Sequence, residues 1–210
     1  MRPTVAVAVM AKAPQPGLAK TRLIPALGAP GAAALALRLL DHAVAQAHAA
    51  AVGPVTLWCT PNTSHASFEA LRLRHDIALA PQQGADLGQR MHHIFEQAAG
   101  ALLLMGTDLP GLSADVIREA ALRLADHDAV FVPALDGGYG LVGLTMPCAA
   151  LFSDMRWSTP EVMAQTRERL ALAGLSYFEL PALQDIDEPA DLIHLSADWR
   201  ADLPLLEKSE

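Results

Sequence analysis

Cysteine is scarce in this sequence, and long apolar runs are missing. Its two cysteines, Cys59 and Cys148, lie far apart without a CxxC or Cys/His spacing, which argues against a disulfide framework or a structural zinc site. No run approaches the roughly eighteen apolar residues of a membrane helix. The N-terminal apolar stretch is short, lacks a signal-type cleavage region and leads directly into Lys12 and Pro14. These absences predict a soluble protein of the reducing cytoplasm with no membrane partner.

Acidic residues are absent from the first 40 positions, although the whole chain carries a net charge of -8. The overall negative charge argues against a general nucleic-acid-binding protein. Two of the three lysines in the chain, Lys12 and Lys20, fall in one loop of this acid-free segment, together with Arg22. An acidic protein with a locally cationic N-terminal segment is suited to hold a small anion there.

Two familiar phosphate-binding patterns are also missing. A Walker A loop would need glycine at positions 14 and 19, where this chain has Pro14 and Ala19. No GxGxxG follows the first expected strand, which removes the main sequence argument for a dinucleotide-dependent oxidoreductase. If the cationic loop binds phosphate, it does so by another arrangement.

The chain is expected to form one domain over residues 1–210, with a frayed tail from about residue 199. Hydrophobic residues make up 52% and charged residues 18%, and no linker divides the sequence. Strand and helix patterns alternate, which predicts a three-layer α/β/α sandwich with a mainly parallel mixed sheet. Strands are expected at 4–11, 55–59, 77–80, within 101–112, and at 129–133, 139–144 and 176–180; helices are expected at 31–51, 64–74, 86–99, from 113, at 159–174 and from about 189.

The stretch 101–112 is central because a short apolar run ends in a carboxylate, Asp108. The run suits a strand that is buried on both faces, and Asp108 would then lie just beyond its carboxyl end. Open α/β sheets bind ligands in the crevice at that edge. The alternative is a structural one, because Asp before Leu-Pro-Gly is also good turn chemistry.

The loop from Lys12 to Arg22 follows the first expected strand and is expected to bind an anion. Its backbone amides, including that of Gly17, and the side chains of Lys20, Thr21 and Arg22 can converge on phosphate oxygens at the carboxyl edge of the sheet. The alternative is a solvated basic loop.

Five motifs follow one another along the chain: Met10-Ala-Lys-Ala-Pro-x-Pro-Gly-x-x-Lys-Thr-Arg-Leu23, Gly106-Thr-Asp-Leu-Pro-Gly-Leu112, Pro133-Ala-x-Asp-Gly-Gly-Tyr139, Trp157-Ser-Thr159 and Asp185-Ile-Asp-x-Pro-x-Asp-Leu192. In this order they resemble a bacterial family of small GT-A-fold, nucleotide-diphospho-sugar transferase-like proteins, and the similarity spans nearly the whole chain. Members are often named glycosyltransferases, some are linked to arsenosugar biosynthesis, and the pattern is related to 2-phospholactate guanylyltransferases and molybdenum cofactor nucleotidyltransferases.

The resemblance implies that Asp108 binds a divalent cation, Mg or Mn, that bridges the phosphates of a nucleotide. Hard carboxylate oxygens suit either ion. The chain has Asp-Leu-Pro where many glycosyltransferases have Asp-x-Asp, so a second ligand must come from elsewhere. Asp187 is the best candidate, with Asp185 behind it. Both acids lie before Pro189, so they can instead cap the last helix.

The resemblance also assigns the remaining contacts with the nucleotide and the acceptor. Nucleotide contacts are expected from Lys12, Gly17, Lys20, Thr21, Arg22, Gln82, Gln83, Gly84, Arg90 and Thr107. The amide groups of the two glutamines can donate to and accept from the edge of a base. Arg90 can instead solvate a helix face, and Asp86 is more simply a helix cap.

Acceptor contacts are expected from Asp136, Gly137, Gly138, Tyr139 and Trp157. Asp136 can bind sugar hydroxyls or act as a general base, and an ordinary Asp-Gly turn is the alternative. The two glycines let the backbone pass close to a ligand. Trp157 can equally cover the core.

The sequence therefore predicts a metal-dependent transferase in which Lys20 and Arg22 hold donor phosphates and Asp136 works on the acceptor. The preferred reaction is glycosyl transfer from a nucleoside diphosphate sugar to a small acceptor. The alternatives are nucleotidyl transfer from a nucleoside triphosphate with release of pyrophosphate, and a catalytically silent nucleotide-binding module.

Overall fold

A computed structural model describes residues 4–201 and 203 of the chain. Its centre is a seven-stranded sheet with the strand order β3-β2-β1-β4-β6-β5-β7. Only β6 runs antiparallel to its neighbours, so the expected mainly parallel mixed sheet is confirmed. The strands are β1 (Ala6–Lys12), β2 (Val55–Thr60), β3 (Ala78–Pro81), β4 (Leu102–Met105), β5 (Ala129–Pro133), β6 (Tyr139–Leu144) and β7 (Tyr177–Glu179).

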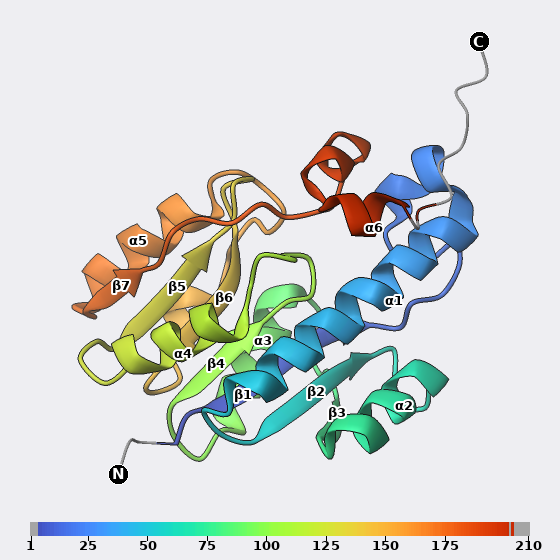
Figure 1. The fold of residues 1–210 in the computed structure, drawn as a ribbon. Coiled ribbons are helices and arrows are strands. Elements are labelled where there is room, and N and C mark those ends of the chain that lie inside the picture. Colours follow the sequence, from blue (N-terminus) through green and yellow to red (C-terminus); the bar gives the residue numbers. More distant parts are fainter. Residues whose placement is uncertain (1–3, 202, 204–210) are drawn as a thin grey trace.

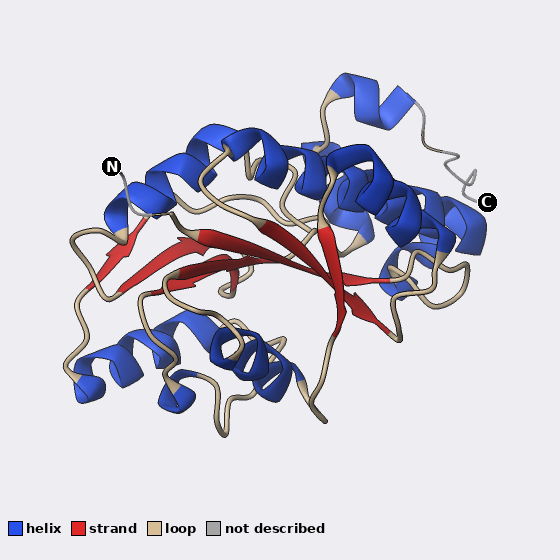
Figure 2. Ribbon diagram, turned by 90° about the horizontal axis from the view of Figure 1, so that it is seen from below, coloured by secondary structure: helices blue, strands red, loops and turns tan. Residues whose placement is uncertain are grey.

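Helices cover both faces of the sheet, as Figure 2 shows. Residues of α1, α2 and α4 share one buried apolar cluster with the strands, and residues of α3 and α5 share a second cluster on the other face. The α-helices are α1 (Ile24–Ala50), α2 (Ala66–His75), α3 (Leu87–Glu96), α4 (Ala114–Arg123), α5 (Val162–Ala173) and α6 (Ala197–Ala201), and short 3-10 helices are η1 (Thr21–Leu23), η2 (Ala149–Leu151) and η3 (Pro189–His194). Figure 1 shows this order along the chain.

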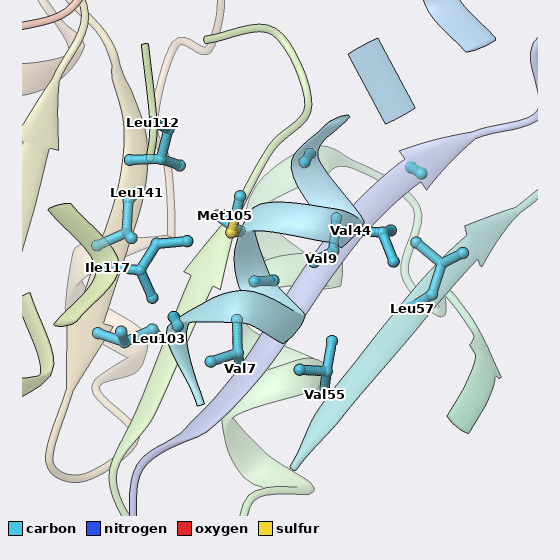
Figure 3. Packing of buried hydrophobic residues seen from close by; sticks show 14 of the residues in the cluster. Val7, Val9, Val44, Val55, Leu57, Leu103, Met105, Leu112, Ile117 and Leu141 are labelled. Carbon is cyan, nitrogen blue, oxygen red and sulfur yellow. The ribbon is translucent and has the colours of Figure 1, made fainter. Parts of the chain in front are cut away.

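The two clusters follow from the alternation of side chains along each strand. Successive side chains of a strand point to opposite faces, so Val7 and Val9 of β1 pack on one face and Ala8 on the other. Val44 of α1 covers the face of Val7 and Val9 (Figure 3). All four residues of β4 are buried, which confirms a strand enclosed on both faces.

The N-terminal helix begins earlier than the sequence pattern predicted. The sequence pattern placed this helix at residues 31–51, but α1 starts at Ile24 and continues to Ala50. Pro25 occupies the first turn, where a missing N–H costs nothing. Gly28 has φ +67° and ψ 165°, which is a non-helical conformation, so two helical segments meet there at a kink.

The segment Thr21–Ala50 is long and apolar enough to cross a membrane by length and composition alone, contrary to the expectation that no run qualifies. The core helix of a soluble protein passes the same test. In this fold one face of α1 is buried: Leu40 and Val44 pack in the main cluster, and Leu35 and Leu39 pack in a third cluster with Ile186. Packing against the rest of the chain therefore accounts for the apolar composition of the helix.

The C-terminal segment differs from the predicted final helix. Residues from Pro189 form the 3-10 helix η3, whose start is fixed by a capping box between Glu188 and Asp191. Residues 199–201, which were expected in the frayed tail, form the end of α6, and Trp199 packs against the third cluster. The remainder of the predicted tail, residues 202 and 204–210, lies outside the described residues.

The strand order places a crevice at the carboxyl edge of the sheet. Strand β1 lies between β2 and β4 and is parallel to both. The chain leaves β1 toward one side, for β2, and returns later on the other side, as β4. The loops after β1 and β4 therefore part at this edge, where doubly wound sheets bind their ligands.

Candidate functional site

A cavity of about 610 Å³ lies at this edge of the sheet. It brings together side chains from the loop after β1, the turn after β4, the turn between β5 and β6, and the segment before η3. The predicted site residues that line it are Lys12, Lys20, Thr21, Arg22, Thr107, Asp108, Asp136, Gly138, Tyr139, Trp157, Asp185 and Asp187.

Lys20 connects three of these segments. Its ammonium lies 2.7 Å from Oδ1 of Asp108 and 3.5 Å from Oδ1 of Asp187, and it donates a hydrogen bond of 2.5 Å to the carbonyl of Ile186. The side chain is only 7% exposed. The backbone of Lys20 has φ +47°, a left-handed conformation that costs a non-glycine residue roughly 1–2 kcal/mol. Such strain is typical of functional positions whose geometry the surrounding structure enforces.

Arg22 extends this charge network toward solvent. Its Nη1 donates to Oδ2 of Asp187 at 2.8 Å and lies 3.7 Å from Oε1 of Glu188. The predicted phosphate-binding cations are therefore paired with the predicted metal ligands. Lys12 also lines the cavity and has an exposed side chain.

The segment that carries Asp185 and Asp187 is anchored to the central turn. The amide of Ile186 donates to the carbonyl of Asp108 at 2.9 Å, so Asp187 faces the turn after β4. The side chain of Asp185 is buried on the inner side of this segment. Burial raises the pKa of Asp185 above its usual value, and the negative charge of Asp136 raises it further.

The two predicted metal ligands meet at one point, although they do not form a larger ligand set. Asp108 and Asp187 contact the same ammonium group. Across residues 4–201 and 203, no group of three or more His, Cys, Asp or Glu side chains is arranged to hold a metal ion. A metal at Asp108 and Asp187 would need oxygen ligands from water or from a bound nucleotide.

The acceptor-side turn is shaped by contact within the chain. Gly137 has φ +94°, and a Cβ at this position would lie 2.2 Å from the carbonyl oxygen of Pro160. The close approach of Gly137 is therefore to the segment after Trp157, while Gly138 lines the cavity and an approach of this backbone to a ligand stays a prediction. Asp136 accepts a hydrogen bond from the amide of Gly138 at 2.9 Å, and its other oxygen has no hydrogen-bond partner among the described residues.

Tyr139 and Trp157 form one wall of the cavity. Their rings meet edge to face at 6.4 Å between centroids, and both pack against the second apolar cluster. Trp157 therefore packs on the core, as one interpretation expected, and also lines the cavity, whereas its contact with an acceptor stays a prediction. Burial raises the pKa of the Tyr139 phenol, so it stays neutral at physiological pH.

The residues predicted to bind the nucleotide base lie outside this lining. Gln82 donates to the carbonyls of Ala11 and Trp58, at 3.1 and 2.8 Å, and so ties the ends of β1 and β2 together. Arg90 donates to the carbonyl of Gly84 at 3.0 Å, beside the exposed Gln83. Gly17 and Gly137 are also absent from the lining. The predicted role of Gly137 in acceptor binding, and of the other residues in nucleotide binding, stays a prediction.

Sequence reasoning missed the apolar floor of the cavity. Leu87 and Met91 of α3 line it, together with Leu104 of β4. Leu87 and Met91 belong to the helical periodicity of residues 86–99, which indicated only a core face. Their place in the first helix after the expected third strand was the available signal that they lie near the carboxyl edge of the sheet.

The mostly parallel sheet, with this cavity at its carboxyl edge, matches a nucleotide-diphospho-sugar transferase fold. A crystal structure from Desulfovibrio desulfuricans G20, described as a "putative nucleotide-diphospho-sugar transferase", matches with a TM-score of 0.83 and 28% identity over 95% of this chain and 89% of that chain. The resemblance noted from the motifs is thereby confirmed. The chain belongs to the family described as "Uncharacterized protein conserved in bacteria (DUF2064)", whose profile matches residues 43–159.

More distant structures share the fold. A 4-diphosphocytidyl-2C-methyl-D-erythritol synthase from Anaerococcus prevotii matches with a TM-score of 0.61 and 8% identity, over 91% of this chain and 97% of that chain. A glucosyl-3-phosphoglycerate synthase from Mycobacterium tuberculosis, in complex with Mn²⁺ and uridine diphosphate, matches with a TM-score of 0.54 and 8% identity, over 91% and 75%. No curated protein sequence matches this chain. The fold is thus common to nucleotidyl- and glycosyltransferases.

The close approach at Gly137 gives a testable expectation for stability. Gly137→Ala should lower the free energy of unfolding by more than Gly174→Ala does. Both glycines have positive φ, so a Cβ costs about 1–2 kcal/mol at either position. Nothing lies within 4 Å of a Cβ at Gly174, whereas at Gly137 it meets backbone, which adds about 1–3 kcal/mol. Chemical denaturation measures both losses, and equal losses would contradict the close approach.

Proposed function

We propose that this protein is a divalent-metal-dependent transferase that moves a glycosyl group from a nucleoside diphosphate sugar to a small acceptor. The observation that carries the proposal is the meeting of Lys20, Asp108 and Asp187 at the carboxyl edge of a nucleotide-diphospho-sugar transferase fold. These groups supply a cation for phosphate and two carboxylates for a metal in the same cavity. The catalytic, nucleotide, acceptor and metal roles given to individual residues are parts of this proposal.

The pair Asp108 and Asp187 fits a bound Mg²⁺ or Mn²⁺. Each carboxylate places an oxygen within 3.5 Å of the Lys20 ammonium, so the chain already holds one cation between them. Mg²⁺ commonly binds through one or two carboxylates, waters and substrate phosphates, which matches a site with only two protein ligands. When bound, the metal would neutralise charge that develops on the departing phosphate.

Lys12, Lys20 and Arg22 are proposed to hold the donor phosphates. Hydrogen bonds from ammonium and guanidinium groups to phosphate are stronger than those between neutral groups. Lys20 and Arg22 are ion-paired with carboxylates in the described structure. A metal at Asp108 and Asp187 would take over these carboxylates and free both cations for phosphate.

Charge at the far end of the cavity favours glycosyl transfer over nucleotidyl transfer. Asp136 and Asp185 both line that end. Nucleotidyl transfer to a phosphate or carboxylate would bring an anionic nucleophile against these acids, and like charges repel. In glycosyl transfer the bond from the anomeric carbon to the β-phosphate oxygen breaks, its electron pair leaves with the nucleoside diphosphate, and an acceptor hydroxyl attacks the carbon. Asp136 is proposed to take the hydroxyl proton.

Nucleotide binding should depend on metal through Asp108. A ligand that binds only the folded state raises stability by mass action, so ADP, GDP, UDP and CDP can be compared in thermal-shift titrations with and without Mn²⁺. The matching diphosphate should stabilise the wild type further when Mn²⁺ is present, and Asp108→Asn should abolish this extra stabilisation. Asp126→Asn, at the opposite edge of the sheet, is the matched control. Undiminished metal dependence in Asp108→Asn would exclude this ligand.

Replacement of the loop cations should separate two roles of Lys20. Lys20→Ala and Arg22→Ala should each weaken nucleoside diphosphate binding by about 1.5–3 kcal/mol, the range for hydrogen bonds to charged groups. Without nucleotide, Lys20→Ala should bind Mn²⁺ more tightly than the wild type, because its ammonium no longer competes for Asp108 and Asp187. Calorimetric titration measures both, with Arg167→Ala, which removes an ion pair to Glu179, as control. Unchanged nucleotide binding in the double variant would show that Lys20 and Arg22 do not bind the phosphates of the nucleotide.

The reaction type is decided by the products. Purified protein with Mn²⁺ and a small-molecule cell extract should release a nucleoside diphosphate from a nucleotide sugar, and Asp108→Asn should lose this release. Asp108-dependent pyrophosphate release from a nucleoside triphosphate, with nucleotide sugars untouched, would instead identify a nucleotidyltransferase. Binding without either release would identify a catalytically silent nucleotide-binding module.

A further inference from the structure

A second cavity, of about 410 Å³, adjoins the acceptor end of the first. Asp136, Asp185, Asp187 and Arg22 line both cavities, so the two communicate through these side chains. Five carboxylates line the second cavity, and Arg22 is the one arginine or lysine among the described residues that does so. The cavity is therefore strongly negative.

Three of these carboxylates already have partners. Asp187 and Glu188 lie within 2.8 and 3.7 Å of the Arg22 guanidinium. Asp191 accepts from the amides of Asp187 and Glu188, at 3.0 and 2.7 Å, as part of the capping box of η3. These contacts within the chain hold the segment in place and balance part of its negative charge.

The other two carboxylates have no cationic partner among the described residues. Asp185 is 9% exposed, yet no other described residue donates a hydrogen bond to its carboxylate. Its own backbone amide is the one donor to this carboxylate among the described residues, and burial of Asp185 disfavours the charged form unless a ligand compensates its charge. Asp136 has one backbone hydrogen bond and a free second oxygen.

The backbone places these two carboxylates beside each other. Ala134 and Leu183 form a parallel bridge, and the amide of Leu135 donates to the carbonyl of Leu183 at 3.0 Å. Asp136 and Asp185 each follow the bridged residue by two positions, so they lie at the same level of the two segments. Both line the same two cavities.

We propose that Asp136 and Asp185 form a cation-binding subsite that holds a positively charged nitrogen of an organic acceptor. This inference rests on the proposed function, which supplies the acceptor. It adds that the acceptor is an amine rather than a neutral or anionic compound. The ammonium is the anchor. A hydroxyl elsewhere in the same molecule attacks the donor. Asp136 would thus both bind the ammonium and take the proton of this hydroxyl.

An organic cation fits this subsite better than a second metal ion. Two carboxylates alone leave most of a Ca²⁺ coordination sphere unfilled, and Mg²⁺ held by two carboxylates usually also binds substrate phosphates, which the proposed function places at Asp108 and Asp187. A volume of about 410 Å³ also accommodates a small organic molecule rather than a single ion. An ammonium group supplies three donors, enough for both carboxylates.

The test uses a bacterial small-molecule extract separated by charge. The extract is passed over chelating resin to remove divalent metals and divided into a cation-exchange fraction, an anion-exchange fraction and a neutral flow-through. Each fraction is titrated into the protein without any nucleotide, and stabilisation against heat is followed. The cationic fraction should stabilise the wild type, and Asp136→Asn and Asp185→Asn should each require about tenfold more of it, the factor expected from the loss of one charge-assisted hydrogen bond. Asp126→Asn should behave as wild type.

Stabilisation by the neutral or anionic fraction alone, by no fraction, or only before chelation would overturn the proposal. Urea denaturation of Asp185→Asn distinguishes lost binding from lost folding, since an Asn there removes an uncompensated buried charge and should leave the variant at least as stable as the wild type. These titrations contain no donor, so they test the subsite without testing transfer. If the protein binds amines but transfers nothing, the proposed function is contradicted and the subsite is not. Transfer to an uncharged acceptor would retain the function and refute this subsite.

Discussion

The contact of Lys20 with Asp108 and Asp187 is the interaction on which the arrangement of the site depends. It joins the loop after the first strand, the turn after the central strand and the C-terminal segment before η3. Two further hydrogen bonds connect the same segments. Lys20 donates to the carbonyl of Ile186 at 2.5 Å, and the amide of Ile186 donates to the carbonyl of Asp108. Because the ammonium is nearly buried, its charge must be balanced locally, and the two carboxylates do this. The charges of Lys20 and Arg22 are thus balanced by those of Asp108 and Asp187, and under the proposed function phosphate and metal would exchange partners with these side chains.

The buried parts of the fold could be predicted from the sequence because their apolar patterns are strong. The bounds of β5 and β6 agree with the pattern at 129–133 and 139–144, and Asp86 and Ser113 cap helices as their sequence context indicated. The start of α1 could not be read in the same way, because Pro25 and Gly28 are usually helix breakers. The first turn tolerates that proline, and a kink accommodates the glycine.

Individual residues of the cavity could be predicted from the sequence, but the ion pairs between them could not. Position after a strand and motif order pointed to Lys20, Arg22, Asp108 and Asp187, all of which line one cavity. That the cations and carboxylates pair with each other depends on tertiary structure, since the partners are distant in sequence. Gln82 illustrates the reverse case. An amide suited to a base edge is equally suited to two backbone carbonyls, and only the fold shows that it contacts Ala11 and Trp58.

The direction of β6 has a consequence for how specificity can change over evolutionary time. Because β6 is antiparallel to its neighbours, its first residue rather than its last reaches the cavity edge, and the turn from β5 supplies Asp136 there. Lys20, Arg22 and Asp108 come from the loop after β1 and the turn after β4, outside this turn. Under the proposed function, substitution of Asp136 would change the acceptor side of the cavity while these proposed donor-side residues stay the same. A single scaffold of this kind can diversify into a set of enzymes that share a donor and differ in the molecule they modify.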